Sequence, residues 1–205
     1  VNYFNPEYEI YTRYKASRNE KEGLSSPVVG RTIEDKNGNL WIGTEGGGLN
    51  FYNRRTREFK WYIAGKGHNS ISHSNVKALY YDPAKEIIWI GTHLGGLNKL
   101  DIRTGAFTHY LMEEGNPETL PSNIVRDITP YHDQLIVATQ NGVCLFDPHS
   151  GKCRQLFKDT KEGRKITMVA DVEVDNNGTL WIAATGEGIF SYRFDTNKLA
   201  NYRHD

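Results

Sequence analysis

The fold is decided by Leu40-Trp41-Ile42-Gly43-Thr44-Glu45-Gly46-Gly47-Gly48-Leu49-Asn50-Phe51-Tyr52, where apolar and polar residues alternate on both sides of a glycine cluster. Alternation with a period of two is typical of a β-strand, and two such strands around a glycine turn form a hairpin. The pattern recurs as Ile88-Trp89-Ile90-Gly91-Thr92-His93-Leu94-Gly95-Gly96-Leu97-Asn98. The sequence therefore predicts a repeated β-hairpin.

The spacing of the repeat indicates the architecture. Trp41 and Trp89 are 48 residues apart, the equivalent Ile136 follows after 47 residues, and Trp181 follows after 45. A period in the mid-forties occurs in propeller blades and in helical arrays, and the local alternation favours strands.

Each repeat contains four strand signals separated by turn residues, which is the content of one antiparallel propeller blade. The sequence predicts an all-β protein with four complete four-stranded blades. The expected strands are 28–34, 40–44, 49–52 and 59–63; 76–81, 87–92, 97–100 and 107–111; 124–129, 134–139, 143–146 and 153–157; and 168–174, 179–184, 188–194 and 199–203.

The amino-terminal residues 1–14 align with 49–62 at a constant offset of 48, which predicts the third and outermost strands of a preceding blade. The expected division is a partial blade over 1–22 and blades over 23–67, 68–115, 116–161 and 162–205. Propellers usually close with about 4 to 8 blades, so the sequence predicts an open β-propeller fragment of a larger array. Its open edges favour self-association.

Composition excludes several classes of function. The 25 Lys and Arg residues balance 25 Asp and Glu residues, so charge gives no reason to expect nucleic acid or an anionic membrane as a partner of this segment. No apolar run approaches the roughly 18 residues of a membrane span. Aromatic residues make up 12% of the chain and lie in short runs between turn residues, as in all-β proteins.

The segment Leu40-Trp41-Ile42-Gly43-Thr44 with Gly47-Gly48-Leu49-Asn50, preceded by Ile33-Glu34-Asp35-Lys36-Asn37-Gly38-Asn39, resembles the two-component regulator propeller repeat. Such repeats form the sensor region of hybrid two-component histidine kinases of Bacteroidetes. The resemblance covers nearly the whole chain and recurs four times. The third copy, Leu135-Ile136-Val137-Ala138-Thr139, is the most degenerate because it lacks the tryptophan.

The resemblance implies a periplasmic part of an inner-membrane protein, a sensor histidine kinase joined to a response regulator. Many sensors of that family detect oligosaccharides and switch on glycan-utilisation genes, which implies carbohydrate sensing and transcription regulation. The expected partners are the remaining blades and downstream domains of the same chain and an oligosaccharide. No cofactor is expected.

Catalysis by the segment itself is not expected, because it contains no Gly-x-Ser-x-Gly, phosphate loop or His-Glu-x-x-His. Two alternatives remain open. The first is a propeller-fold lyase or hydrolase acting on glycans, which needs a paired acid and base at the channel rim. The second is a scaffold for protein partners, which needs a contiguous apolar patch.

Metal binding is not expected either. Residues 173–178 resemble half of a calcium loop, but Asx turns between the first two strands of a blade explain the pattern without a metal. His68, His73 and His93 lack the spacing of zinc ligands and belong to linkers and turns on one rim.

Tryptophan recurs at positions 41, 89 and 181, and a ring repeated in every blade fits packing between neighbouring sheets. Trp61 is not repeated, is expected to be exposed and is therefore a candidate ligand contact. Cys144 and Cys153 flank a turn between the third and fourth strands of one blade. A disulfide between them requires a register that places both on the same face.

Propellers bind ligands mostly at the channel mouth, which is built by the loops between second and third strands and by the linkers into the next first strand. Loops carry function because the sheets hold them while their sequences vary. Asn75 and Asn123 in the linkers have a second interpretation, local capping of the backbone. The candidate ligand contacts are Glu45, Trp61, Asn75, His93, Asn123, Gln140, Asn141 and Glu187.

Overall fold

The computed structural model describes residues 12–65, 69–157 and 166–203. Its strands form four antiparallel four-stranded sheets, each a meander in chain order, which confirms the predicted blades. The strands are β1 Val29–Glu34, β2 Leu40–Thr44, β3 Leu49–Asn53 and β4 Glu58–Tyr62; β5 Val76–Asp82, β6 Ile87–Thr92, β7 Leu97–Asp101 and β8 Phe107–Tyr110; β9 Val125–Tyr131, β10 Gln134–Thr139, β11 Gly142–Phe146 and β12 Cys153–Gln155; and β13 Val169–Val174, β14 Thr179–Ala184, β15 Gly188–Arg193 and β16 Lys198–Tyr202.

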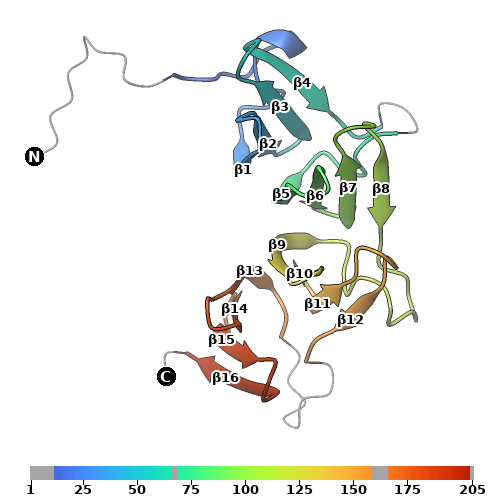
Figure 1. Ribbon diagram of the computed structural model, residues 1–205, viewed down its shortest axis with the longest axis vertical. Coiled ribbons are helices and arrows are strands. Elements are labelled where there is room, and N and C mark those ends of the chain that lie inside the picture. Colours follow the sequence, from blue (N-terminus) through green and yellow to red (C-terminus); the bar gives the residue numbers. More distant parts are fainter. Residues whose placement is uncertain (1–11, 66–68, 158–165, 204–205) are drawn as a thin grey trace, which may run out of the picture.

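The four sheets fan out along an arc (Figure 1). The first strand of each sheet, β1, β5, β9 or β13, lies on the concave side, and the fourth strand lies outermost (Figure 1). Consecutive first strands contact one another, β1 with β5, β5 with β9 and β9 with β13. The concave side is therefore lined by one strand from every blade, which is the position of a propeller channel.

The turn between the second and third strands of a blade requires glycine, because the backbone of the fourth strand lies very close to it. Gly48 and Gly96 have φ angles of 75° and 66°, in the left-handed region. A Cβ atom at Gly48 would lie 2.1 Å from the carbonyl oxygen of Tyr62, and one at Gly96 would lie 2.3 Å from that of Tyr110. The glycines let each hairpin turn directly beside the end of its own fourth strand.

Hydrophobic packing between sheets builds the core. In β10, Leu135 and Val137 pack in a cluster with Trp89 of the second blade, whereas Ile136 and Ala138 pack in a cluster with residues of the fourth. Successive side chains of a strand point to opposite faces, so one strand serves two interfaces. This explains why the middle strands are apolar on both faces and not on one.

The segment that precedes β1 lies against the outer strands of the first blade. The two strands expected before residue 23 fall partly on residues 1–11, which lie outside the described residues, and residues 12–14 are not in a strand. The Tyr14 ring lies 4.7 Å from that of Tyr52 and 5.7 Å from that of Phe59, measured between centroids. A short 3₁₀ helix, η1 Glu20–Glu22, contacts β4.

Candidate functional site

The channel mouth is held together by repeated backbone hydrogen bonds between neighbouring blades. The Gly48 N–H donates to the carbonyl of Ser74 at 2.7 Å, and the Gly96 N–H donates to the carbonyl of Asn123 at 2.9 Å. At the third junction the Met168 N–H donates to the carbonyl of Gln140 at 2.7 Å. Each loop between second and third strands therefore meets the linker that enters the next blade, as expected from the sequence.

At the first junction several candidate residues lie together. The carboxylate of Glu45 pairs with the ammonium of Lys77 on β5, and this hydrogen bond lowers the pKa of Glu45. The rings of His73 and His93 are 6.1 Å apart between centroids. The backbone N–H of Asn75 donates to Nδ1 of His73 at 3.1 Å, which places the proton of a neutral His73 on Nε2.

The two linker asparagines bind backbone. Oδ1 of Asn75 accepts the N–H of Gly46 from the first blade, and Oδ1 of Asn123 accepts the N–H of Met112 at 2.7 Å. These backbone donors lie 29 and 11 residues earlier in the chain, so the two side chains join separate segments and are not the local caps that were one of the two interpretations.

The remaining mouth candidates belong to the third and fourth blades. Gln140 and Asn141 form the short loop between β10 and β11, and Glu187 lies in the loop between β14 and β15. Asn141 is exposed, and its backbone N–H donates to Oγ1 of Thr139 at 3.2 Å. The carbonyl of Glu187 accepts a hydrogen bond from the side-chain amide of Asn201 at 3.1 Å.

Trp61 is not the exposed side chain that the sequence suggested. It lies on β4, the outermost strand, and packs against the small core of the first blade. Its indole N–H donates to the carbonyl of Gly23 at 2.8 Å. The segment before β1 covers this ring, a contact that no repeat pattern predicts. Trp61 therefore lies at the outer edge of the first blade with its indole N–H already occupied.

The repeated tryptophans differ in exposure. Trp41 and Trp89 are 2% and 1% exposed and lie in the clusters between sheets, whereas Trp181 is 37% exposed. Among the described residues, no further sheet covers the face of the fourth blade on which Trp181 lies.

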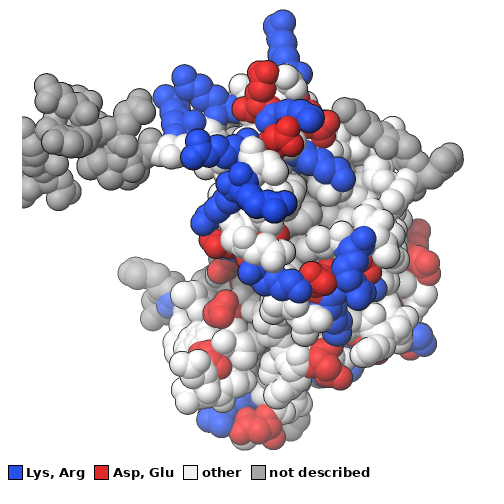
Figure 2. Space-filling view, turned by 45° about the horizontal axis from the view of Figure 1, so that its top comes forward, with Lys and Arg blue, Asp and Glu red and all other residues white. Residues whose placement is uncertain are grey.

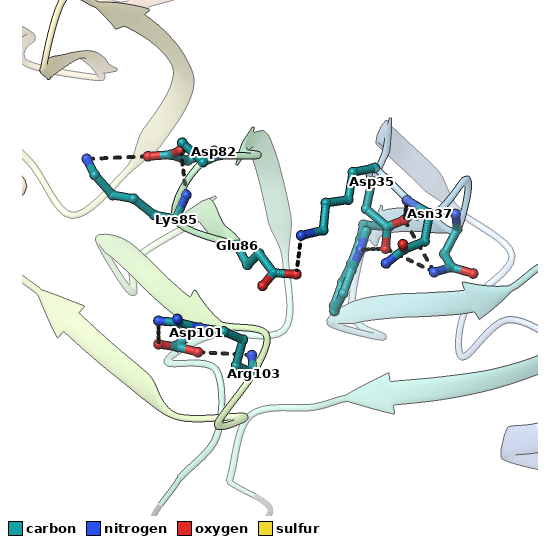
Figure 3. Close-up of polar contacts among 11 residues, drawn as sticks. Asp35, Asn37, Asp82, Lys85, Glu86, Asp101 and Arg103 are labelled. Carbon is teal, nitrogen blue, oxygen red and sulfur yellow. Dashed lines mark hydrogen bonds and ion pairs between the residues drawn. The ribbon is translucent and has the colours of Figure 1, made fainter.

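The turn before the tryptophan orients its ring, a role that the sequence analysis missed. Oδ2 of Asp35 accepts the indole N–H of Trp41 at 3.1 Å, while Oδ1 accepts the backbone N–H groups of Asn37 and Asn39 (Figure 3). The spacing of six residues between aspartate and tryptophan, shared by Asp35 and Trp41 with Asp175 and Trp181 but absent before Trp89, was the available signal.

The candidate calcium loop is one of these turns. Asp175 accepts N–H groups from Asn177, Thr179 and the indole of Trp181, and the last of these is the main cause of its lowered pKa. The carboxylate is thus saturated by local donors, as in an Asx turn. In the part of the chain that the structure describes, no group of three His, Cys, Asp or Glu side chains is placed to hold a metal ion.

The blades also contact one another away from the mouth. Lys36, in the β1–β2 turn, pairs with Glu86 of the β5–β6 turn at 2.9 Å (Figure 3). One face of the molecule shows Lys and Arg side chains gathered over its upper and middle parts with Asp and Glu between them (Figure 2). Such exposed pairs contribute little stability individually.

Three charged residues meet in the channel, although they come from three different blades. Arg31 on β1 pairs with Asp171 on β13, and its Nη2 atom lies 3.4 Å from Oδ1 of Asp127 on β9. Oδ2 of Asp127 accepts the backbone N–H of Val172 at 3.1 Å. Burial is the largest cause that raises the pKa of Asp127, from 3.8 to about 6.

Replacing Asp127 with asparagine is expected to remove one component of the pH dependence of stability. A folded-state pKa of about 6 lies above the unfolded value near 4, so the native state binds the extra proton between these pH values. The contribution of Asp127 to the free energy of unfolding is therefore largest below pH 4. It falls by at most about 3 kcal/mol as the pH rises through 6. Urea unfolding between pH 4 and 7.5 measures it, with Asp133→Asn, at an exposed position of the β9–β10 turn, as control. An unchanged pH profile in Asp127→Asn would show that Asp127 titrates normally.

The cysteines lie on the same face of their sheet. Cys144 is opposite Gln155 and Phe146 is opposite Cys153, so the two are diagonal neighbours across β11 and β12. Both are buried free thiols whose sulfur atoms are 3.2 Å apart. The two thiols are therefore in contact but not joined by the disulfide that the sequence left undecided. The hydrogen bond to Cys153, with burial, raises the pKa of Cys144 well above its usual value.

The fold can now be compared with known proteins. Residues 77–203, more than half of the chain, match the family model of the SMP-30/gluconolactonase/LRE-like region. The chain belongs to this family. In this SMP-30/gluconolactonase/LRE-like chain, residues 23–46 match the two component regulator propeller model, which confirms the resemblance predicted from the repeat. Comparison with curated proteins finds no match.

Among solved structures, this family member is similar to the extracellular domain of a hybrid two component system of B. thetaiotaomicron, with a TM-score of 0.77 and 24% identity over 94% of the chain. It is also similar to the extracellular domain of a one component system of the same organism, with a TM-score of 0.76 and 22% identity over 99% of the chain. The chain spans only 27% and 28% of those two domains. In the described residues, no helix has the length and apolar character needed to cross a membrane.

Proposed function

We propose that this chain is part of an extracytoplasmic sensor propeller of a hybrid two-component system. The observation that carries the proposal is the match of almost the whole arc to the extracellular domains of a hybrid two component system and of a one component system, combined with the regulator-propeller match in the first blade. The parent protein is proposed to be a sensor histidine kinase joined to a response regulator, located in the inner membrane with this part in the periplasm.

The ligand is proposed to be an oligosaccharide that controls glycan-utilisation genes. The mouth residues Glu45, His73 and His93, together with Gln140 and Asn141 on the next loop, supply donors and acceptors at the end of the channel. The mouth joins neighbouring blades through backbone hydrogen bonds, so a ligand bound there can favour one packing of the blades over another. It shifts that equilibrium only by its difference in affinity for the two states.

The exposed lateral face of the fourth blade supports the proposal that this chain is part of a larger propeller or oligomer. Trp181, Ile189 and Tyr202 are 37%, 48% and 55% exposed on β14, β15 and β16. We propose that this face packs against another blade, from the same polypeptide or from a second copy. Apolar side chains at equivalent positions of the other sheets pack between blades.

A titration with plant and host oligosaccharides tests the sensing proposal. We expect saturable binding of one class of glycan, measured by calorimetry and by tryptophan fluorescence, on this chain and on the full protein if the chain is a segment of a longer one. Trp61 lies on the outermost strand β4 and its indole N–H is already bonded to Gly23, while Trp181 lies on the lateral face of the fourth blade, so calorimetry is the primary measurement. Absence of binding to any glycan by either protein would refute direct glycan sensing.

A lactone-hydrolysing enzyme is the second candidate, because the matched family model names gluconolactonase. An assay of sugar-lactone hydrolysis with and without added divalent cations separates the two. We expect no rate above the uncatalysed reaction, whereas turnover would favour the enzyme over the sensor.

A further inference from the structure

A β-bulge recurs at the mouth end of the innermost strands. In β5, Val76 pairs with Thr92 and Ala78 with Gly91, which leaves Lys77 as the extra residue. The same shift leaves Arg126 extra in β9 and Ala170 extra in β13. A bulge re-aims the side chain of the extra residue. Three blades therefore present one such position each, and two of these three positions carry a cation.

Lys77 already has an anionic partner. It pairs with Glu45, the first residue of the β2–β3 loop in the preceding blade. The equivalent first loop residue in the second blade is His93, so the repeat supplies no carboxylate for Arg126. The matching hydrogen bonds of Gly48 and Gly96 to the following linkers show that the two junctions are built alike.

Arg126 carries an unpaired donor in the described part of the chain. Its Nε atom is buried and has no hydrogen-bond partner, and no ion pair involves Arg126 within the described ranges. The neighbouring carboxylate of Asp127 is held by Arg31 and by the backbone of Val172. A buried donor without an acceptor is costly, and the planar guanidinium fork fits a carboxylate or a sulfate.

We propose that Arg126 anchors an anionic group of the ligand, the carboxylate or sulfate ester of an acidic oligosaccharide, at the mouth between the second and third blades. This inference rests on the proposed sensing of oligosaccharides and names the class of sugar. His93, which opens the facing loop, and His73 beside it lie at the same rim. The proton on Nε2 of His73 makes that ring a second fixed donor.

The experiment uses four probes, trigalacturonate, its methyl ester, a sulfated chondroitin disaccharide and inorganic sulfate, with affinities measured by calorimetry. We expect an acidic saccharide to bind more tightly than the neutral ester, with an affinity that falls as salt is raised. Arg126→Gln should weaken this binding roughly tenfold or more, and Arg126→Lys should restore part of it. Lys152→Gln, which removes an exposed cation already paired with Glu118 from the β11–β12 turn, is the charge-matched control and should change affinity less than about twofold.

Different outcomes overturn different statements. Binding of an acidic saccharide that Arg126→Gln leaves unchanged, or tight binding of the neutral ester alone, overturns this inference and leaves oligosaccharide sensing standing. Binding of inorganic sulfate as tight as that of the saccharides reduces the site to an adventitious anion site and also overturns it. Failure of every glycan, in this panel and in the wider titration, refutes the proposed function itself. Thermal unfolding of each variant checks its fold, and Arg126→Lys carries the test if Arg126→Gln unfolds.

Discussion

Trp89→Ala is expected to lower the free energy of unfolding by about 3–5 kcal/mol, the range for removing a large buried aromatic side chain. The ring is 1% exposed and lies between the second and third blades. Its centroid is 5.4 Å from that of Phe146 in the neighbouring sheet, in an edge-to-face arrangement. Alanine would leave a cavity at this interface, because rigid sheets on both sides cannot close together. Urea unfolding measures the change.

Trp181→Ala is the matched control, because it removes the same side chain from the same position of the repeat. Its ring is 37% exposed and no further sheet covers it within the described residues, so we expect a loss below about 1 kcal/mol. Equal losses in the two variants would contradict the assignment of Trp89 to an interface between blades. A large loss at Trp181 alone would indicate that another blade covers that face in solution.

The blades were predictable because each depends on a local pattern that the sequence repeats. Alternation sets which face of a strand is buried, and Gly48 and Gly96 mark the turns that only glycine accommodates. The predicted and observed bounds of β2, β6, β10 and β14 agree, because these strands run between strong turn signals and all but β14 are buried on both faces. The loops that meet at the mouth follow from the same repetition.

The individual site residues were less predictable, since their environments depend on residues that do not repeat. Trp61 is covered by the segment before β1, whose path no blade pattern specifies. Arg31 and Asp171 are 140 residues apart and meet only because the arc brings β1 near β13. The bulge at Arg126 adds one residue to a strand without any turn signal, so the alternation pattern does not reveal it.

Oxidative refolding is expected to join Cys144 and Cys153 and to raise the free energy of unfolding by about 2–3 kcal/mol relative to the reduced protein. The bond requires removal of two electrons and two protons from the thiols, which a disulfide oxidant accepts in becoming two thiols. The sulfur atoms are 3.2 Å apart, so rotation of the two side chains closes the gap. Burial and the raised pKa of Cys144 keep thiolate scarce in the folded protein, so the bond should form before the blade is complete.

The position of the pair explains why the third blade would use such a bond. Asn50 and Asn98, at the equivalent places of the first two blades, accept backbone N–H groups from the linker residues Ser25 and Ser72. Cys144 cannot make that contact, and β12 has only three residues.

Intact mass and thiol counting in denaturant identify the oxidised form, and its thermal midpoint should exceed that of the reduced form by about 5–10 °C. The Cys153→Ala variant should show no such difference. Two free thiols after oxidative refolding, or equal midpoints for the oxidised and reduced chain, would contradict this role, because a bond across β11 and β12 must restrict the unfolded chain.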